Sequence, residues 1–305
     1  MKIPADVPEA EVEIDGRRVR LTNLDKPFWP DLGITKRDLL QYYADVSDAL
    51  LPHLTDRAMV MKRYPNGAEG PFFFMKRTPN PHPEWLRTCS IRHASGNVIA
   101  FPIVDDLASL LWVVNLGCID LNQWYGRCDD VDRPDYLHFD LDPVTKEDSK
   151  PARWRQVLET ACAVREALDA LSAPSYPKTS GSRGMHIYVP IVRGPLQKQV
   201  WTFAKQFAKE LESKYPKLIT AEYRVAKRPA GRVLVDYNQN AWGRTLASVY
   251  SVRPRLRATV STPVTWEEVS AGFRITDFDL RNVPRRVEER GDLFQPVLSP
   301  AFSLP

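Results

Sequence analysis

The chain has 305 residues, of which 43% are hydrophobic and 26% charged, as expected of a folded soluble protein with a sizeable core. The net charge is only +4, but Lys and Arg cluster at residues 62–63, 76–77, 227–232 and 253–257, which favours either a polyanionic partner or a set of solvated loops. The four cysteines lack metal-ligand spacing, and neither a charged-then-apolar leader nor a membrane-length apolar run is present, so we expect no zinc site, disulfide framework, secretion or membrane insertion, and a reducing cytoplasm.

The first half of the chain is expected to contain strands and helices in mixed order. Thr35, with Asp38 three residues later, has the pattern of a helix N-cap. Apolar residues at helical spacing extend that helix to Leu50. The other elements expected here are a hairpin over residues 11–21, a strand over 58–64 and a helix over 105–117.

The second half is expected to continue this mixture. Its predicted elements are strands over residues 136–143, 185–191 and 232–237, and amphipathic helices over 151–171 and 197–214. Strands and helices do not alternate strictly along the chain. The sequence therefore predicts an α+β fold, with a central, mostly antiparallel sheet flanked by helices.

The stretch Tyr-Leu-His-Phe-Asp-Leu-Asp-Pro, residues 136–143, is the most informative of these strands. Side chains alternate along a strand, so His138, Asp140 and Asp142 share one face and three apolar residues share the other. Two carboxylates this close repel each other, and burying them unpaired is costly. The pair therefore implies a bound cation, and oxygen ligands suit magnesium or manganese.

Two further features follow the acidic strand. In the turn at residues 178–186, Gly181 and Gly184 permit a tight backbone whose amides, with Ser180 and Arg183, could surround a phosphate, although such turns are often purely structural. Asp236 ends a third apolar strand, where an aspartate is often only a turn residue. Several carboxylates beside donors for a triphosphate are the parts that two-metal nucleotidyl transfer requires.

Together these motifs resemble the archaeo-eukaryotic primase superfamily, and specifically the polymerase domain of ligase D, an end-joining DNA repair enzyme. The resemblance covers about residues 11 to 292. The segments that carry it are Phe139–Pro143, Lys178–His186 and Val235–Tyr237, with Leu21–Lys26, Lys62–Gly67, Asn115–Asp120 and Tyr250–Arg253.

The resemblance implies roles for individual residues. The implied catalytic and metal-binding carboxylates, for two divalent ions (Mn²⁺ or Mg²⁺), are Asp140, Asp142 and Asp236. The implied nucleotide-binding residues are Lys62, Ser180, Gly181, Arg183, His186, Arg244 and Arg253. Those implied to bind DNA are Lys26 and Lys36, at a 5′-phosphate, and Phe73 and Phe74, which would stack on the template. At least one aromatic ring of residues 72–74 is expected to face inward if this segment is a strand.

Three positions depart from the family pattern or have no assigned role. Gln239 stands where many relatives have an arginine, so binding of the triphosphate would depend more on Arg244 or Arg253. Asn122 stands where many have a histidine and cannot act as a cation. His138 is expected to be a strand histidine with satisfied hydrogen bonds.

The resemblance also implies an organisation and a function. We expect one primase-polymerase domain over residues 11–292, built from two packed modules, about 11–130 and about 131–292, with tails at 1–10 and 293–305. Disorder is expected only in these two tails. The implied activity is template-dependent extension or gap filling at DNA ends during non-homologous end joining, with a preference for ribonucleotides. The implied partners are gapped or broken DNA bearing a 5′-phosphate, nucleoside triphosphates, Ku and a DNA ligase, and the implied location is the cytoplasm, at the nucleoid.

Two alternatives remain open from the residues alone. Asp140-Leu-Asp142 also fits the nucleophile signature of haloacid-dehalogenase-type phosphatases, which would require a doubly wound α/β domain. Alternatively, the chain could bridge DNA ends without catalysis.

Overall fold

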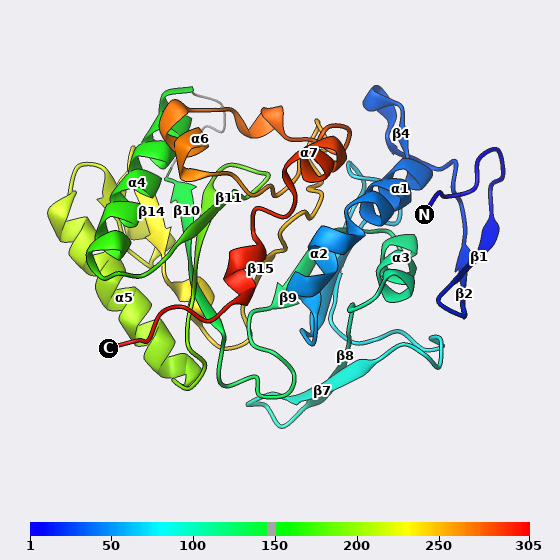
Figure 1. The fold of residues 1–305 in the computed structure, drawn as a ribbon, viewed down its shortest axis with the longest axis horizontal. Coiled ribbons are helices and arrows are strands. Elements are labelled where there is room, and N and C mark those ends of the chain that lie inside the picture. The colour runs from blue at the N-terminus through cyan, green and yellow to red at the C-terminus, as the bar shows by residue number, and fades with distance from the viewer. Residues whose placement is uncertain (145–150) are drawn as a thin grey trace. The chain divides into compact units, whose positions relative to one another are not determined.

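The computed structural model describes residues 1–144 and 151–305 and divides them into two compact units, each with its own sheets and helices (Figure 1). Unit 1 consists of Met1–Asp129, Thr245–Val260 and Asp279–Gly291. Unit 2 consists of Asp130–Arg244, Ser261–Phe278 and Asp292–Pro305. The first division falls after Asp129, but two later segments return to unit 1, so neither unit is one continuous stretch of chain.

Unit 1 contains several short sheets and four helices among its described residues. Its strands are β1 (Ala10–Ile14), β2 (Arg17–Leu21), β3 (Pro27–Trp29), β4 (Ile34–Thr35), β5 (Met59–Arg63), β6 (Phe73–Met75), β7 (Thr88–Arg92), β8 (Val98–Pro102), β9 (Cys118–Trp124) and β15 (Thr245–Ala247). Its helices are α1 (Lys36–Asp45), α2 (Ser47–Leu54), α3 (Leu107–Asn115) and α7 (Val283–Arg290). The predicted hairpin is confirmed as β1 and β2, which pair antiparallel.

The predicted cap of α1 is confirmed, but the helix ends earlier than expected. Thr35 and Asp38 form a reciprocal capping box. Instead of continuing to Leu50, the chain leaves the helix at Val46, where ψ is 4°, and begins again as α2. The Ser47 hydroxyl donates to the carbonyl of Ala44, and such local side-chain bonds compete with the helical pattern.

The main sheet of unit 1 has the order β15-β9-β5-β6, and all its pairs are antiparallel. The buried Tyr43 of α1 joins this sheet to a distant segment: its hydroxyl donates to the carbonyl of Ile119 on β9 and accepts from the amide of Val252. The amide of Leu121 on β9 donates to the hydroxyl of Ser251. These bonds fix residues 251 and 252 beside β9, which sets the position of Arg253.

Unit 2 is built around a five-stranded sheet of order β11-β12-β10-β14-β13. Its elements are β10 (Tyr136–Pro143), α4 (Pro151–Ala170), β11 (Tyr176–Thr179), β12 (Met185–Pro190), α5 (Gln197–Lys214), β13 (Ile219–Thr220), β14 (Val233–Asp236) and α6 (Trp266–Ala271). Every pair is antiparallel except β13 with β14. The α+β, mostly antiparallel prediction is confirmed, although the strands form more than one sheet rather than a single central one.

Helices α4 and α5 lie against this five-stranded sheet (Figure 1). Phe139 of β10 stacks on Phe207 of α5 with ring centroids 4.9 Å apart. Leu137, Phe139 and Leu141 are fully buried. The predicted apolar face of β10 therefore lies under the helices, and the alternation of the strand leaves His138, Asp140 and Asp142 on the other face.

Two expectations about the rest of the chain are wrong. Cys89 and Cys128 form a disulfide, with a Cα–Cα separation of 6.2 Å across 39 residues of sequence. No spacing motif signals this pairing, because strand β7 brings Cys89 to the segment that follows β9. The tail after Asp292 is also ordered rather than loose: Phe294, Val297 and Phe302 are buried. Within the described part of the chain, no helix is long and apolar enough to cross a membrane.

Candidate active site

Four ionisable side chains lie in one transverse row across the sheet of unit 2. The strand register pairs Lys178 with His186, His186 with Asp140, and Asp140 with Asp236. Residues directly opposite in antiparallel strands point to the same face, so the row runs from β11 to β14 on the face opposite α4 and α5. The structure thus brings together Asp140, Asp236 and His186, which the sequence separates by up to about a hundred residues.

The three predicted carboxylates differ in their surroundings. Asp140 is 9% exposed, and its Oδ1 lies 3.4 Å from Nε2 of His186. Asp236 accepts hydrogen bonds from the amide of Asn238 (2.8 Å) and the side chain of Gln239 (3.2 Å). Burial raises the pKa of Asp236 above its ordinary value, and the negative charge of Asp142 adds to that shift. Gln239, a departure from the family pattern, thus supports a candidate metal ligand.

These acids suit a divalent cation by donor type and by position. Carboxylate oxygens are the preferred ligands of magnesium and manganese, and a cation would relieve the repulsion between Asp142 and Asp236. Across residues 1–144 and 151–305, however, no three Asp, Glu, His or Cys side chains are gathered closely enough to form a ready metal site. The backbone places the three acids on one face, while protein groups hold the side chains of Asp140 and Asp236.

Gly184 is required by the close approach of its turn to β10. A Cβ atom at this position would lie 1.9 Å from the carbonyl oxygen of Leu141 and 3.2 Å from Oδ1 of Asp142. Any side chain would therefore collide with the backbone of the acidic strand. The glycine-rich turn and the acidic strand are in direct contact, as the predicted phosphate cradle requires.

The amides of this turn converge on one hydroxyl. The Ser180 Oγ accepts from the amides of Ser182 (3.2 Å), Arg183 (3.3 Å) and Gly184 (3.0 Å). Gly181, with φ of 64°, permits the turn. Successive amides aimed at one oxygen form a concave anion-binding arrangement, in which the serine oxygen occupies the centre. Arg183 of this turn and Arg244 are exposed residues of unit 2.

His138 is buried and packs against the neighbouring strand β12. It is 1% exposed, its backbone amide donates to Oδ1 of Asn240, and its ring stacks on Tyr188 with centroids 5.3 Å apart. The ring thus packs on the same face of the sheet as the ionisable row, next to it along β10 and β12.

In unit 1, a buried aspartate holds two of the predicted nucleotide-binding cations. Oδ2 of Asp120 lies 3.9 Å from Nζ of Lys62 and 3.4 Å from Nε of Arg253. Asp120 is 1% exposed. Burial lowers the pKa of Lys62, and the negative charge of Asp120 opposes that shift. Asn122, the second departure from the family pattern, donates to Oδ1 of Asp120 at 3.1 Å.

Sequence reasoning gave Asp120 no role. Its signal was available, because an ionised residue flanked by Ile119 and Leu121 in a strand needs a partner when buried. The partner Lys62 could not be deduced without the β5–β9 register, which pairs the two residues.

A polar pocket in unit 1 has a volume of about 340 Å³. Among its lining residues are three cations, Lys26, Lys36 and Arg63. Lys36 is 4% exposed, and its Nζ donates to the carbonyl of Thr22 at 2.6 Å. Burial, followed by the charges of Lys26 and Arg63, lowers the pKa of Lys36 to about 8. Such a concentration of positive charge favours an anion of phosphate size. The structure adds Arg63, which sequence reasoning did not assign, to the predicted lysine pair.

The three phenylalanines at residues 72–74 are all exposed, by 50%, 43% and 59%, so the expectation that one faces inward is wrong. The segment is an edge strand whose outer side has no neighbour in the sheet. The register pairs Phe73 with Arg63 and Phe74 with Lys62. Phe73 therefore lies beside Arg63, and Phe74 lies beside Lys62 on the opposite face of the sheet.

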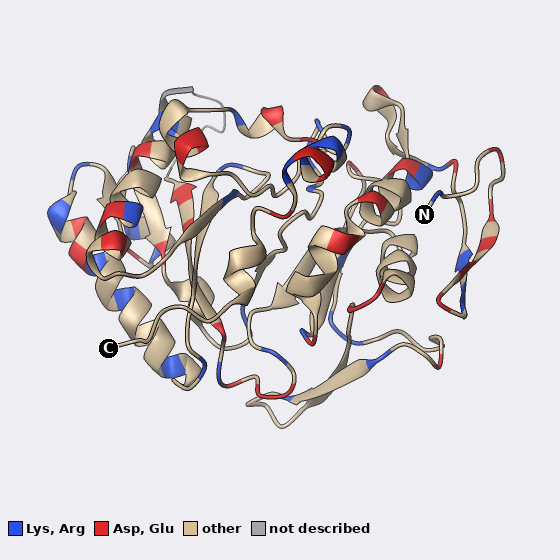
Figure 2. Cartoon of the chain, viewed as in Figure 1, with Lys and Arg blue, Asp and Glu red and all other residues tan. Residues whose placement is uncertain are grey.

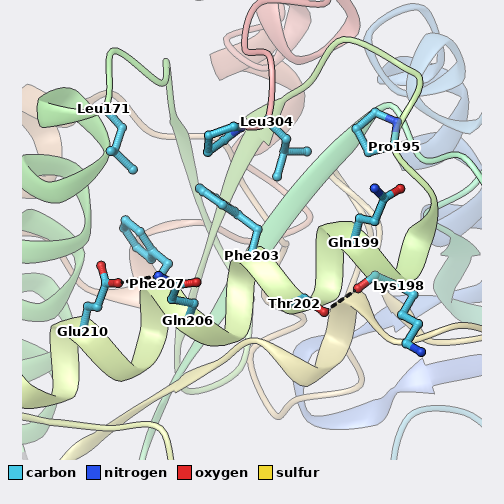
Figure 3. Close-up of a pocket in the computed structure, with 11 residues that line it drawn as sticks. Leu171, Pro195, Lys198, Gln199, Thr202, Phe203, Gln206, Phe207, Glu210 and Leu304 are labelled. Carbon is cyan, nitrogen blue, oxygen red and sulfur yellow. Dashed lines mark hydrogen bonds between the residues drawn. The ribbon is translucent and has the colours of Figure 1, made fainter.

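A separate groove of about 610 Å³ lies along α5 and is lined by Phe203, Phe207, Leu304 and neighbouring residues (Figure 3). None of the predicted site residues lines it. Helices α4 and α5 carry interspersed acidic and basic residues (Figure 2), so this side of unit 2 shows no field of a single sign.

Comparison with known proteins identifies the family. Residues 35–294 match the family model described as LigD, primase-polymerase domain. The chain belongs to this family. The phosphatase alternative is wrong, because β10 lies within an antiparallel sheet rather than a doubly wound parallel one. The matched family is that of a primase-polymerase domain, so the chain is a domain of the polymerase and primase-like nucleotidyltransferase type.

The similarity extends over nearly the whole chain but only part of its relatives. It is 35% identical over 283 residues to the multifunctional non-homologous end joining protein LigD of Mycolicibacterium smegmatis, covering 92% of this chain and 36% of that protein. It is 30% identical to the bifunctional LigD of Bacillus subtilis, covering 90% and 43%. The polymerase domain of Mycobacterium tuberculosis ligase D, solved in complex with DNA, superposes with a TM-score of 0.86 at 32% identity and covers 93% of this chain and 99% of that domain.

Proposed function

We propose that this chain extends the 3′ end of a DNA primer opposite a template at a gap or break, by two-metal nucleotidyl transfer. The ionisable row of unit 2, with its two aspartates, is the observation that carries this proposal. Asp140 and Asp236 are direct register partners, Asp142 shares their face, and the Ser180 turn abuts the same strand. Two divalent cations bound there would supply charge stabilisation for the attacking and leaving oxygens.

The residues of the chain itself would bind and orient the reactants. Ser180, Gly181, Arg183 and His186 would hold the triphosphate beside the acids, and Arg244 would add a further exposed cation in unit 2. Lys62 and Arg253, held by Asp120 in unit 1, would be further nucleotide-binding cations. Asp236 would also help to activate the primer 3′-hydroxyl.

The pocket of Lys26, Lys36 and Arg63 would bind the 5′-phosphate on the far side of a gap. Its three cations and its volume of about 340 Å³ support this role. Exposed Phe73 and Phe74 would stack on template bases, which is worth about 1–3 kcal/mol per base. The DNA bound by the solved M. tuberculosis domain supports a DNA partner for this chain as well.

Further details of the proposal rest on family membership. They are a preference for ribonucleotides and for manganese, and cooperation with Ku and a DNA ligase at chromosomal breaks. The relatives are named as end-joining proteins, which supports this setting.

A primer-extension assay on gapped DNA tests the proposal. Ribonucleotides and deoxyribonucleotides are compared, each with magnesium and with manganese. Asp142→Ala should abolish extension while DNA affinity stays within about twofold, because Asp142 would hold a metal ion rather than DNA. Wild-type extension by Asp142→Ala would sink the metal assignment, and extension absent in the wild type despite tight DNA binding would favour a non-catalytic bridging module.

A further inference from the structure

A fully buried lysine lies at the β11 end of the ionisable row. Lys178 of β11 is 0% exposed. Its Nζ lies 2.7 Å from Nδ1 of His186 and 2.6 Å from Oγ of Ser261. Its ammonium also lies 5.6 Å from the ring centroid of Tyr188. Burying a lysine is costly unless its donors are satisfied, so these contacts call for an account of what the ammonium does.

The direction of each hydrogen bond follows from the donors available. The hydroxyl of Ser261 donates its single proton to the carbonyl of Thr179, at 2.9 Å. Its oxygen therefore accepts from Lys178. With its ordinary positive charge, Lys178 has three donors and no acceptor, and the His186 Nδ1 that faces it then accepts. In a neutral imidazole with Nδ1 as acceptor, the proton resides on Nε2.

We propose that Lys178, in its charged form, is a positioning residue that holds His186 in the Nε2-protonated tautomer. His186 then presents an N–H donor toward the acidic face, where its Nε2 lies 3.4 Å from Oδ1 of Asp140. This inference rests on the proposed function for its consequence, because the same N–H is the one that would meet the triphosphate. Partners that orient a ligand or its neighbour in this way commonly decide the tautomer of a histidine.

The arrangement also explains why a lysine is present at this position. Thr179, the next residue, is held by the amide of Thr262, which donates to its hydroxyl at 3.0 Å. The Lys178 backbone forms a bridge with Pro263 as well. Segment 261–263 therefore contacts Lys178 both at its backbone and, through Ser261, at its Nζ.

The tautomer can be measured directly in the wild-type protein. Histidine is labelled with ¹⁵N, and two-bond ¹⁵N–¹H correlation spectra separate the two tautomers. Loss of one signal set in His186→Gln assigns His186 among the five histidines. The expected pattern is protonated Nε2 with unprotonated Nδ1. A proton on Nδ1, whether in the other tautomer or in a doubly protonated ring, overturns the proposal. This result does not depend on polymerase activity, so it stands apart from the test of the proposed function.

Lys178→Met tests the consequence. Methionine keeps the length and apolar body of the side chain but removes the donors, so His186 should sample both tautomers. The KM for the nucleotide should rise about fivefold, the loss of roughly one hydrogen bond, while DNA affinity stays unchanged. Lys209→Met, on the exposed surface of α5, is the matched control and should alter neither quantity. Retention of the single tautomer and of KM in a folded Lys178→Met protein would overturn the role of Lys178, and if that variant does not fold, the wild-type spectrum alone decides.

Discussion

At the scale of single residues, buried charges set the character of both candidate sites. Asp120 lies between Lys62 and Arg253, two cations that would repel each other without it. Its own oxygens are further held by Asn122. The chain thus keeps a pair of cations together before any triphosphate binds, which reduces the ordering that binding must impose.

We predict that Asp120→Asn raises the KM for the nucleotide by about tenfold, equivalent to roughly 1.4 kcal/mol, with a smaller effect on kcat. The amide has nearly the same shape but removes the negative charge, so Lys62 and Arg253 move apart. Steady-state primer extension at varied nucleotide concentration measures the effect. Asn122→Ala, which removes only a neutral donor to Asp120, is the comparison variant and should cause a smaller rise. An unchanged KM in Asp120→Asn would contradict the role given to the carboxylate.

We predict that the preference for a 5′-phosphate weakens as pH rises. The pKa of Lys36 is lowered to about 8, first by burial and then by Lys26 and Arg63, so the free protein loses this charge as pH passes 8. A phosphate that binds above pH 8 requires Lys36 to take up a proton, and the free-energy cost of this protonation increases with pH. The ratio of Kd values for gapped DNA without and with a 5′-phosphate should therefore fall between pH 7 and pH 9.5.

Lys36→Met provides the control for that measurement. It should make the ratio of Kd values smaller and nearly independent of pH.

The effect of Lys36 on protein stability has the opposite dependence on pH from its effect on phosphate binding. Between pH 8 and the ordinary lysine pKa of 10.5, the unfolded chain binds more protons at this position than the folded one, so Lys36 makes the protein more stable as pH rises. A phosphate preference that grows with pH would contradict the assignment.

At the scale of elements, strong local patterns predicted the structure well. The acidic strand and α5 have the predicted bounds, and the cap of α1 is the predicted one. Strand β11, which carries Lys178, was not predicted, because four residues with a proline show too little alternation. The register of β10 with β14, which joins Asp140 to Asp236, depends on contacts between distant segments and is invisible in a single sequence.

We predict that Gly184→Ala destabilises unit 2 and impairs the site. The added Cβ would meet the Leu141 carbonyl at 1.9 Å, so the turn must move away from β10. The expected cost is about 1–3 kcal/mol, measured by urea unfolding, with nucleotide affinity reduced as well. Gly194→Ala, where a Cβ would meet nothing within 4 Å, is the matched control. Equal unfolding midpoints for the two variants would show that the turn can relax freely.

The disulfide is the second element-scale feature, since it ties β7 to the segment after β9. We predict that reduction lowers the free energy of unfolding by about 2–4 kcal/mol, because it frees a long loop in the unfolded chain. Urea unfolding with and without a thiol reductant measures this change. Cys89→Ser should lose the response to reductant, whereas Cys162→Ser, which changes a free cysteine, should retain it. A wild-type curve indifferent to reductant would argue against the bond.

At the scale of the whole molecule, neither unit is complete in one stretch of sequence. Strand β15 and residues 250–252 belong to unit 1, and they contact it through the pairing with β9 and the hydroxyls of Tyr42 and Tyr43. The sequence suggested modules of consecutive residues because no linker or composition change marks where the chain returns. The family resemblance supplied the site residues, but their grouping into separate clusters required the fold.

We predict that a fragment of residues 1–129 does not fold cooperatively by itself. It lacks β15 and leaves the buried hydroxyls of Tyr42 and Tyr43 without their partners at Tyr250 and Val252. Circular dichroism and hydrogen exchange would measure this, with the full chain as reference. Full protection of β9 amides in the fragment would show that the returning segments are dispensable.

Strand β10 has a consequence for how this family can change. Phe139 packs against α5, and the adjacent residue, Asp140, is part of the ionisable row. Deleting or inserting a single residue there would turn every later side chain to the opposite face, moving carboxylates under the helices and an aromatic ring among the acids. Substitutions in β10 can therefore be tested one at a time, whereas a change in its length would remove the core and the chemistry together.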